Sequence, residues 1–459
     1  MNDFNKISDE FFKKSSWPPA AIVAREIPSI AQDKVFFALY KELYFRHFHW
    51  RNPQDVTIYT RFDSWLAYSQ VFQALLDSND GVVLPVEWLY DIIDEFIFQF
   101  QAFSNYKTES EKLTDQEKQL LMDNSKTWNP AETTKILYHV ALKGGVVVET
   151  DVMSKVIKIQ KILGYFALVG LTRLQILIGD HDSAIKILNH LKMPSLRKIV
   201  RLNVCHVSVE YFRGFCQVVT GDFGSALQTL AKLVMYIRRT NVHKAERQYS
   251  HHTRSILKRS DKVIGLLSIV HCMCPNIRMG NDVRETMHQK MESKLDKMRN
   301  KNDLVALDVF EDVFETSCPP FTNGNAVDYA SETKMIDATV HQTQILLELV
   351  RRRRQLPKIF SLLKLYKTLS LSKLVGLGTE NYTEEDVEIM RRRLICLKFT
   401  TRRQTQALNS YRRGDQQHRT HYWLENDVVQ IQQEQKKRHY GGFFIENIKQ
   451  LSTTFNDLN

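Results

Sequence analysis

The residues best suited to metal binding are two groups of histidines and cysteines, and neither has the spacing of a known metal site. The chain contains His271-Cys272-Met273-Cys274 and the pair His251-His252. Zinc sites use Cys-x-x-Cys with a second ligand pair at a fixed distance, whereas here one residue separates the two cysteines and no second pair follows. The six cysteines of the chain are therefore expected to be reduced thiols in apolar surroundings. We predict no metal site and no cofactor.

Residues for phosphate binding or nucleophilic catalysis do not occur in the arrangements that those reactions need. The sequence has no Walker loop, no G-x-G-x-x-G, no H-E-x-x-H and no G-x-S-x-G. Gly376-Leu377-Gly378 lacks the third glycine of a phosphate loop and is better interpreted as a helix end. Acidic pairs such as Asp94-Glu95 are adjacent on a predicted helix, where neighbouring side chains diverge. We predict that the protein is not an enzyme and has no small-molecule substrate.

The remaining chemically distinctive residues are basic ones near the C-terminus. Residues 331–459 contain 22 Lys and Arg against 14 Asp and Glu, which gives +8 of the total net charge of +11. Such a segment could contact RNA phosphates, be a solvated face, or pair with an acidic partner subunit. The helix expected over 384–397 begins with several acids, which argues against base-specific recognition. The candidate RNA contacts are Arg402, Arg403, Arg412, Arg413 and Arg419.

The composition indicates which elements could position these residues. Gly (17) and Pro (11) are scarce in 459 residues of which 43% are hydrophobic, and so few chain breakers favour long helices over a β-sandwich or barrel. The start, Met1-Asn2-Asp3-Phe4, has no signal-peptide pattern. The longest nearly apolar run, Ile162–Leu171, is shorter than the roughly 20 residues of a membrane-spanning helix. We predict a cytoplasmic, all-α protein without a membrane contact.

Helical periodicity is clearest over residues 84–104. Pro85 suits the first turn of a helix, where its missing N–H costs nothing. Seven apolar side chains follow i, i+3, i+4, i+7 spacing and share one face. They are Leu89, Ile92, Ile93, Phe96, Ile97, Phe100 and Phe103.

An internal repeat follows between residues 156 and 240. Gly179–Leu188 matches Gly221–Leu230 at an offset of 42 residues. In both copies a Gly-Asp pair follows an apolar helix and an alanine opens the next helix. This pattern is typical of the helix–turn–helix units of tetratricopeptide-like solenoids.

The C-terminal part has a different pattern. Short helices are expected over 359–369, 371–377 and 384–397, followed by strands His421–Leu424 and Val428–Ile431 around a tight turn. Three helices and a hairpin predict a winged helix, and an amphipathic helix follows it. The predicted regions are an N-terminal helical region (1–155), helical repeats (156–354), a winged helix (355–434) and a C-terminal helix (435–459).

Several sequence blocks, spread from about residue 35 to 455, resemble a known family. They are Phe37–His47, Arg61–Ser64, Leu84-Pro85, Trp88–Ile97, Gln99–Gln101, Leu163–Leu171, Ser317–Pro319, Tyr422–Ile431 and Tyr440–Ile445. The chain is similar to the L-subunit family of eukaryotic translation initiation factor three, within the wider group of PCI scaffold proteins. On this resemblance the PCI homology begins near residue 210.

The resemblance implies a non-catalytic scaffold that acts in translation initiation on the small ribosomal subunit. Such a subunit would pair with the K subunit and join other PCI subunits through its winged helix and terminal helix. Alternatives are a PCI subunit of the proteasome lid or signalosome, or an independent RNA-binding adaptor. The expected interface residues are Tyr422, Trp423, Val428, Ile431, Phe444, Ile445, Ile448, Leu451, Phe455 and Leu458.

Overall fold

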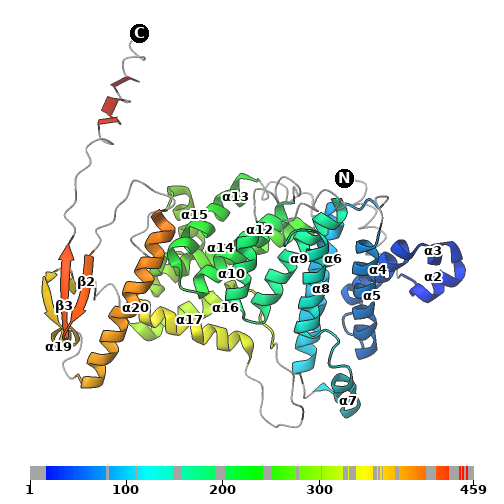
Figure 1. Ribbon diagram of the computed structural model, residues 1–459, viewed down its shortest axis with the longest axis horizontal. Helices are drawn as coiled ribbons and strands as arrows, with labels where there is room; N and C mark the ends of the chain where they lie inside the picture. Colours follow the sequence, from blue (N-terminus) through cyan, green and yellow to red (C-terminus); the bar gives the residue numbers. More distant parts are fainter. Residues whose placement is uncertain are drawn as a thin grey trace. The chain divides into compact units, whose positions relative to one another are not determined.

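The structure is a computed structural model in which helices dominate and one small sheet lies near the C-terminus (Figure 1). The described residues are 17–78, 82–109, 112–147, 158–191, 202–240, 251–274, 279–300, 302–323, 329, 337–354, 359, 362–363, 365–377, 382–409, 420–433, 444–445, 447–448 and 451–452. The chain divides into two compact units, Met1–Arg351 and Arg352–Asn459. The predicted fold class, a helical-repeat solenoid followed by a winged helix, is confirmed.

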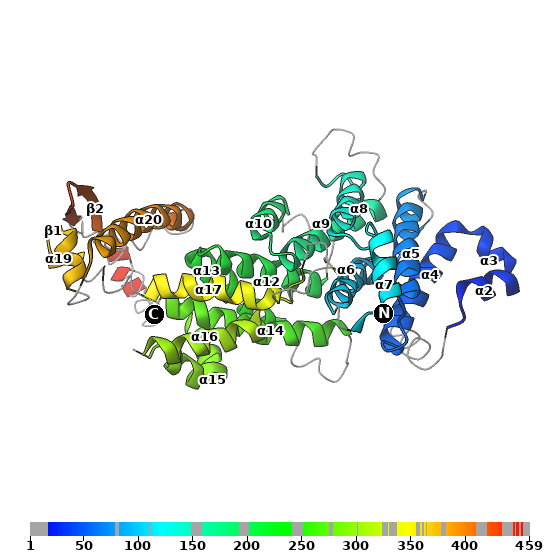
Figure 2. The same cartoon turned by 90° about the horizontal axis from the view of Figure 1, so that it is seen from below.

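The first unit consists of helices that pack mainly against their neighbours in the sequence, as Figure 2 also shows. The described helices are α2 (Ala20–Glu26), α3 (Pro28–Gln32), α4 (Lys34–Arg51), α5 (Ile58–Leu76), α6 (Val86–Thr108), α7 (Asp115–Asp123), α8 (Pro130–Lys143), α9 (Lys158–Leu177), α10 (His181–His190), α12 (Asn203–Val219), α13 (Phe223–Arg239), α14 (His251–Met273), α15 (Asn281–Met298), α16 (Asp303–Ser317) and α17 (Ala338–Arg354). One continuous hydrophobic core runs from α4 to α17.

The apolar stripe predicted for α6 is confirmed. All seven of its members are buried, whereas Phe98 on the opposite face is half exposed. Pro85 is the residue directly before the first turn rather than inside it. Because α6 packs on α9, this stripe joins the N-terminal helices to the repeats.

The predicted repeat is also confirmed as two equivalent helical turns. Gly179 and Gly221 have φ angles of +85° and +78°, a left-handed conformation that costs glycine little. Asp180 and Asp222 each cap the following helix by accepting a hydrogen bond from the backbone N–H three residues later. The alanines that follow, Ala184 and Ala226, are fully buried where the paired helices meet.

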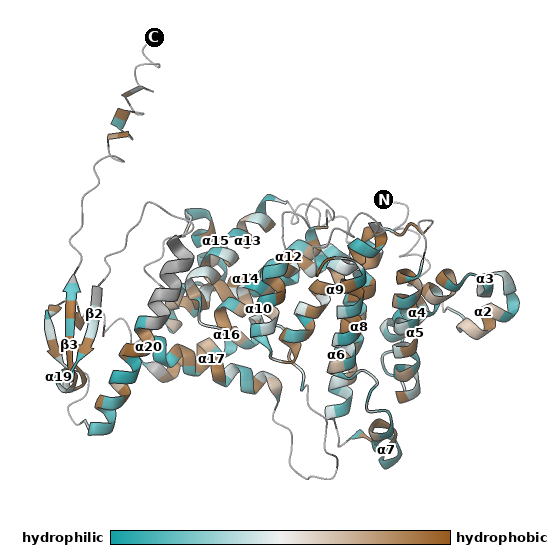
Figure 3. Ribbon diagram, viewed as in Figure 1, coloured by the Kyte–Doolittle hydropathy of each residue, from teal (hydrophilic) through white to brown (hydrophobic). Residues whose placement is uncertain are grey.

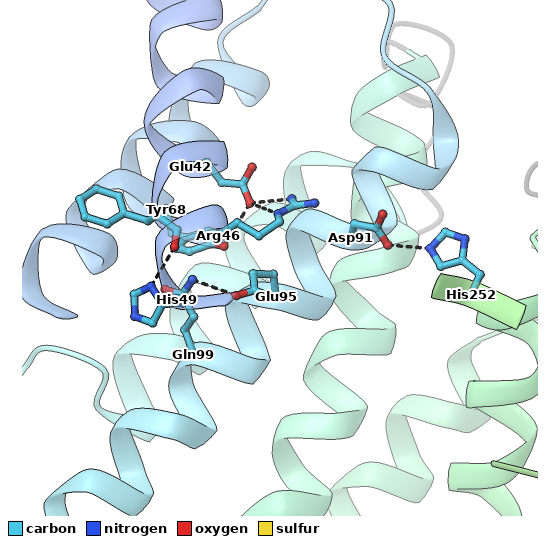
Figure 4. A network of polar contacts seen from close by, with 9 residues as sticks. Glu42, Arg46, His49, Tyr68, Asp91, Glu95, Gln99 and His252 are labelled. Carbon is cyan, nitrogen blue, oxygen red and sulfur yellow. Dashed lines mark hydrogen bonds and ion pairs between the residues drawn. The ribbon is translucent and has the colours of Figure 1, made fainter. Parts of the chain in front are cut away.

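A polar network lies inside the N-terminal end of this unit (Figure 4). Arg46 of α4 donates to Glu42 at 2.6 Å, and the hydroxyl of Tyr68 in α5 donates to the same Glu42 oxygen at 3.1 Å. Gln99 donates to Glu95 at 3.0 Å within α6. The four helices α4, α5, α6 and α14 thus share a polar region inside an otherwise apolar core, since Asp91 of α6 also contacts a histidine of α14.

The second unit is the winged helix. Its described elements are β1 (Thr368–Ser370), α19 (Leu371–Gly376), α20 (Glu384–Asn409), β2 (Thr420–Glu425) and β3 (Val428–Gln433). The strands form an antiparallel sheet in the order β1-β3-β2. A separate hydrophobic core holds the unit together, and the described part of α20 contains both hydrophilic and hydrophobic residues (Figure 3).

Two predicted boundaries in this unit were wrong. The helix expected over 359–369 does not reach its predicted end, because Thr368–Ser370 form strand β1 with Leu369 opposite Val429. Pairing with a distant strand here outweighs the local helical pattern. The helix expected to end at 397 continues to Asn409. No Gly or Pro lies between its two ends, so nothing in the sequence stops the helix earlier.

Candidate partner interface

The hairpin of the winged helix is formed by a two-residue turn. Asn426 and Asp427 have positive φ angles of 44° and 65°, which is the geometry that a two-residue hairpin requires. The backbone carbonyl of Asp427 accepts a hydrogen bond of 2.9 Å from the N–H of Leu371. This hydrogen bond attaches the turn to the start of α19. The packing of the unit therefore determines which side of the hairpin is exposed.

The strand register divides the four predicted hairpin residues between the two faces of the sheet. Tyr422 lies opposite Ile431, and both side chains belong to the hydrophobic core. Their neighbours on the other face are Trp423, which is 43% exposed, and the half-buried Val428. Only these last two present side chains for direct contact, whereas the first two would support an interface through the shape of the sheet.

The hydroxyl of Tyr422 anchors the hairpin to α20. It donates to the backbone carbonyl of Leu394 at 2.7 Å inside the unit, and burial raises the pKa of this tyrosine. A capping box begins α20. Thr383 and Asp386 each accept a hydrogen bond from the backbone N–H of the other.

The basic residues of α20 are partly neutralised within the unit. Arg391 contacts Asp427 of the turn and also forms an ion pair with Glu388 at 3.2 Å. Arg392 lies 3.6 Å from the same glutamate. Each cation that pairs with a carboxylate is less available to an RNA phosphate. This region therefore offers less positive potential than its count of arginines suggests.

The predicted RNA contacts lie at the end of α20 and after it in the sequence. Arg402 and Arg403 belong to the last part of α20 by their backbone. The remaining three, Arg412, Arg413 and Arg419, lie outside the described residues. Their proposed contact with RNA remains a prediction.

The C-terminal segment presents apolar side chains to solvent. The exposed fractions of Phe444, Ile445, Ile448 and Leu451 lie between 58% and 70%. Their backbone is helical where it is described. Phe455 and Leu458 lie outside the described residues. An exposed apolar group of this kind is typical of a segment that packs against another protein.

The buried cysteines behave as core residues. Burial raises the pKa values of the Cys205 and Cys216 thiols to about 12, so both are protonated near neutral pH. In the part of the chain that the structure describes, no cluster of three or more His, Cys, Asp or Glu side chains is arranged to hold a metal ion. None of the helices described here has the combination of length and apolarity that spanning a bilayer requires.

Sequence reasoning missed strand β1 and the contact between Arg391 and Asp427. The two residues of this ion pair are distant in sequence, and no local pattern connects them. A weak signal for β1 does exist, because Leu369 and Leu371 alternate with polar residues as in a strand.

Comparison with known proteins extends over nearly the whole chain. The sequence model of a family described as "RNA polymerase I-associated factor PAF67" matches residues 60–451. A protein of Nematostella vectensis is 30% identical over 470 residues, covering 97% of this chain and 86% of that protein. A Drosophila melanogaster protein is 30% identical over 482 residues, with 100% and 86% coverage. A Danio rerio protein is 30% identical over 465 residues, with 97% and 78% coverage. All three bear the name "Eukaryotic translation initiation factor 3 subunit L".

Proposed function

This chain belongs to the family of eukaryotic translation initiation factor 3 subunit L, and we propose that it is a non-catalytic scaffold subunit of that complex. It acts in translation initiation, on the small ribosomal subunit and in the cytoplasm. The observation that carries this function is the agreement in name among relatives that match nearly the full chain. The solenoid and the winged helix supply surfaces for neighbours, as expected of a scaffold.

We place the main contact surface at the C-terminal end of the chain. The winged helix exposes Trp423, and the segment after it exposes Phe444, Ile448 and Leu451. Burying such apolar side chains against another subunit contributes about 25 cal/mol per Å² of apolar surface. The partners are the K subunit and other PCI subunits of the same complex, which bring winged helices and terminal helices of their own.

The test is removal of residues 440–459. We expect the shortened chain to keep the helix content and melting temperature of the first unit, because α4 to α17 have their own core. The chain should no longer purify with the other subunits. A matched variant, Phe444→Ser with Ile448→Ser and Leu451→Ser, should give the same loss at full length. Unchanged co-purification of both variants would refute this contact surface.

The second candidate is an independent RNA-binding adaptor, which the basic C-terminal residues would support. Pairing of Arg391 with Asp427 and Glu388 favours the scaffold instead. Isolated protein should bind single-stranded RNA weakly. An adaptor would bind RNA tightly by itself and lose affinity steeply between 50 mM and 200 mM salt. The same salt titration on assembled complex separates binding by this chain from binding by its neighbours.

A further inference from the structure

Helix α4 lies near the N-terminal end of the helical stack and carries partly buried aromatic side chains on the side opposite its fully buried residues. Phe37, Tyr40, Tyr44 and Phe48 follow spacings of three and four residues, so they share one side of the helix. The opposite side packs into the core through Ala38 and Leu39. The end of a solenoid normally presents a polar capping face to solvent. An aromatic face is therefore unusual at this position, where, among the described residues, only the short helices α2 and α3 and the residues just before them precede α4 and contact it.

Helix α5 continues this face. Lys41 of α4 donates to Gln70 of α5 at 3.1 Å, which places the outer sides of the two antiparallel helices next to each other. Leu66 lies one turn before Gln70, and 56% of it is exposed. We call Phe37, Tyr40, Tyr44, Phe48 and Leu66 the aromatic surface.

The elements before α4 cover this surface only in part. Trp17 stacks on the ring of Tyr40 at 5.7 Å, and the Tyr40 hydroxyl donates to the carbonyl of Pro18 at 2.8 Å. Helix α2 contacts α4, although none of its own residues is fully buried. Among the described residues, the hydroxyl of Tyr44 has no hydrogen-bond partner.

The charges that surround the aromatic surface are mostly positive. Lys34, Lys41 and Arg51 lie on the same side of α4 as the aromatic rings, by their spacing. The other two charged residues of α4, Glu42 and Arg46, pair with each other inside. The nearby carboxylates are Asp33, which caps α4 by accepting hydrogen bonds from the backbone N–H groups of Val35 and Phe36, and the exposed Asp63 of α5. Three cations around an apolar stripe match a partner that is apolar on one side and acidic at its borders.

The ring contacts favour a protein partner over RNA. Single-stranded RNA would need open ring faces for base stacking. One face of Tyr40 is occupied by Trp17, and the amine of Lys41 lies over the ring of Phe37 at 4.7 Å from its centre. Tyr44 and Phe48 contact each other at 6.1 Å. Together these rings present a ridged apolar surface, of the kind into which an amphipathic helix can pack.

We propose that the aromatic surface of α4 and α5 is a docking site for an acidic amphipathic helix of another protein chain. The helix would place apolar residues at i, i+3, i+4 and i+7 against the rings and Leu66. Its glutamates or aspartates would lie near Lys34, Lys41 and Arg51, within reach of the Tyr44 hydroxyl. This site is separate from the winged helix, and the proposal does not depend on the proposed function.

The test uses the full chain and synthetic fluorescent peptides. One peptide carries leucines at the helical spacing above with glutamates elsewhere, and the other has lysines in place of the glutamates. We expect the acidic peptide to bind at least tenfold more tightly than the basic one in fluorescence anisotropy. The variant Tyr44→Ser with Leu66→Ser should weaken binding of the acidic peptide at least tenfold.

The matched control is Tyr138→Ser with Leu142→Ser on α8, where the side chains are 48% and 45% exposed. This variant removes the same chemistry elsewhere and should bind like the unaltered chain. A second variant, Lys34→Glu with Arg51→Glu, leaves the rings intact and should reverse the preference between the two peptides. Circular dichroism and thermal melting establish that each variant is folded.

Any one of the following results would overturn the proposal. The first is that the chain binds both peptides equally tightly, or binds neither. The second is that the α8 control loses as much affinity for the acidic peptide as the Tyr44→Ser, Leu66→Ser variant. The others are that this variant loses binding to single-stranded RNA instead of to the peptide, and that the chain self-associates through the same residues. Peptide binding that requires removal of residues 1–16 would also overturn it, since the occupant would then belong to this chain.

Discussion

Glu95 of α6 is a carboxyl group whose protonation is coupled to the stability of the first unit. Burial raises its pKa to about 7, while the charge of Arg46 and the hydrogen bond from Gln99 oppose this effect, and Glu42 and Asp94 add to it. Burial also raises the pKa of Glu42, which shares the same arginine. Burial is thus the main reason that both carboxyl groups ionise less readily in the folded protein than in the unfolded chain.

The substitution Glu95→Gln tests this arrangement. An unfolded chain keeps a glutamate pKa of about 4.3, so the folded state binds the additional proton above that value. Stability therefore falls as pH rises from about 4.5 to about 7. The variant should lose this slope and be about 1 to 2 kcal/mol more stable than the original chain at pH 8, with little difference at pH 5.

Urea denaturation across this pH range measures the effect. The control is Glu285→Gln on α15, where Gln289 donates to an exposed glutamate in the same i, i+4 geometry. This control should change neither the free energy of unfolding nor its dependence on pH. A variant Glu95→Gln that is less stable at pH 8 would show that the ionised carboxylate is stabilising.

Variants at Tyr422 and Trp423 should distinguish an effect on folding from an effect on assembly. Tyr422→Phe removes the buried hydrogen bond to the carbonyl of Leu394 and should cost about 1 kcal/mol. Trp423→Ser changes an exposed side chain and should leave folding nearly unchanged, while weakening binding to other subunits. Hydrogen exchange of the α20 amides measures the first effect, and co-purification measures the second. The same phenotype from both variants would contradict this division.

Among the elements, the helices with strong local patterns could be predicted from the sequence. The stripe of α6 and the Gly-Asp turns at Gly179 and Gly221 depend on neighbouring residues, which is why their patterns were sufficient. Strand β1 and the ion pair of Arg391 depend on β3 and on the hairpin turn. Because those contacts join distant parts of the chain, no window of sequence contains them. The outward position of Trp423 could have been predicted from the sequence, because strand side chains alternate between faces.

The two repeat turns give a prediction at this scale. Gly179→Ala and Gly221→Ala force a side chain into a left-handed conformation and should each cost about 1 kcal/mol. The first should cost more, because a new Cβ there would lie 2.9 Å from Gln342 Nε2, against 3.6 Å from Leu349 Cδ1 at the second. Gly280→Ala is the control, since its Cβ would meet nothing within 4 Å. Thermal unfolding gives all three values, and equal stability of the three variants would count against the turn geometry.

At the scale of the whole molecule, the exposed apolar side chains are the features best suited to function. The first unit has a continuous core and the winged helix has its own, so each can fold while leaving apolar side chains for neighbours. Net charge of +11 assists encounter with anionic partners, but it does not define which partner binds. Specificity must come from apolar contacts at defined positions.

Affinity purification of the tagged full-length chain from cells, with nuclease and 0.3 M salt, tests the central claim most directly. Identification of the bound chains should show the other subunits of initiation factor 3 in near-equal amounts, retained after nuclease treatment because protein contacts hold them. Recovery of the chain alone, partners that vanish with nuclease, or subunits of the proteasome lid, signalosome or an RNA polymerase in their place would contradict the account.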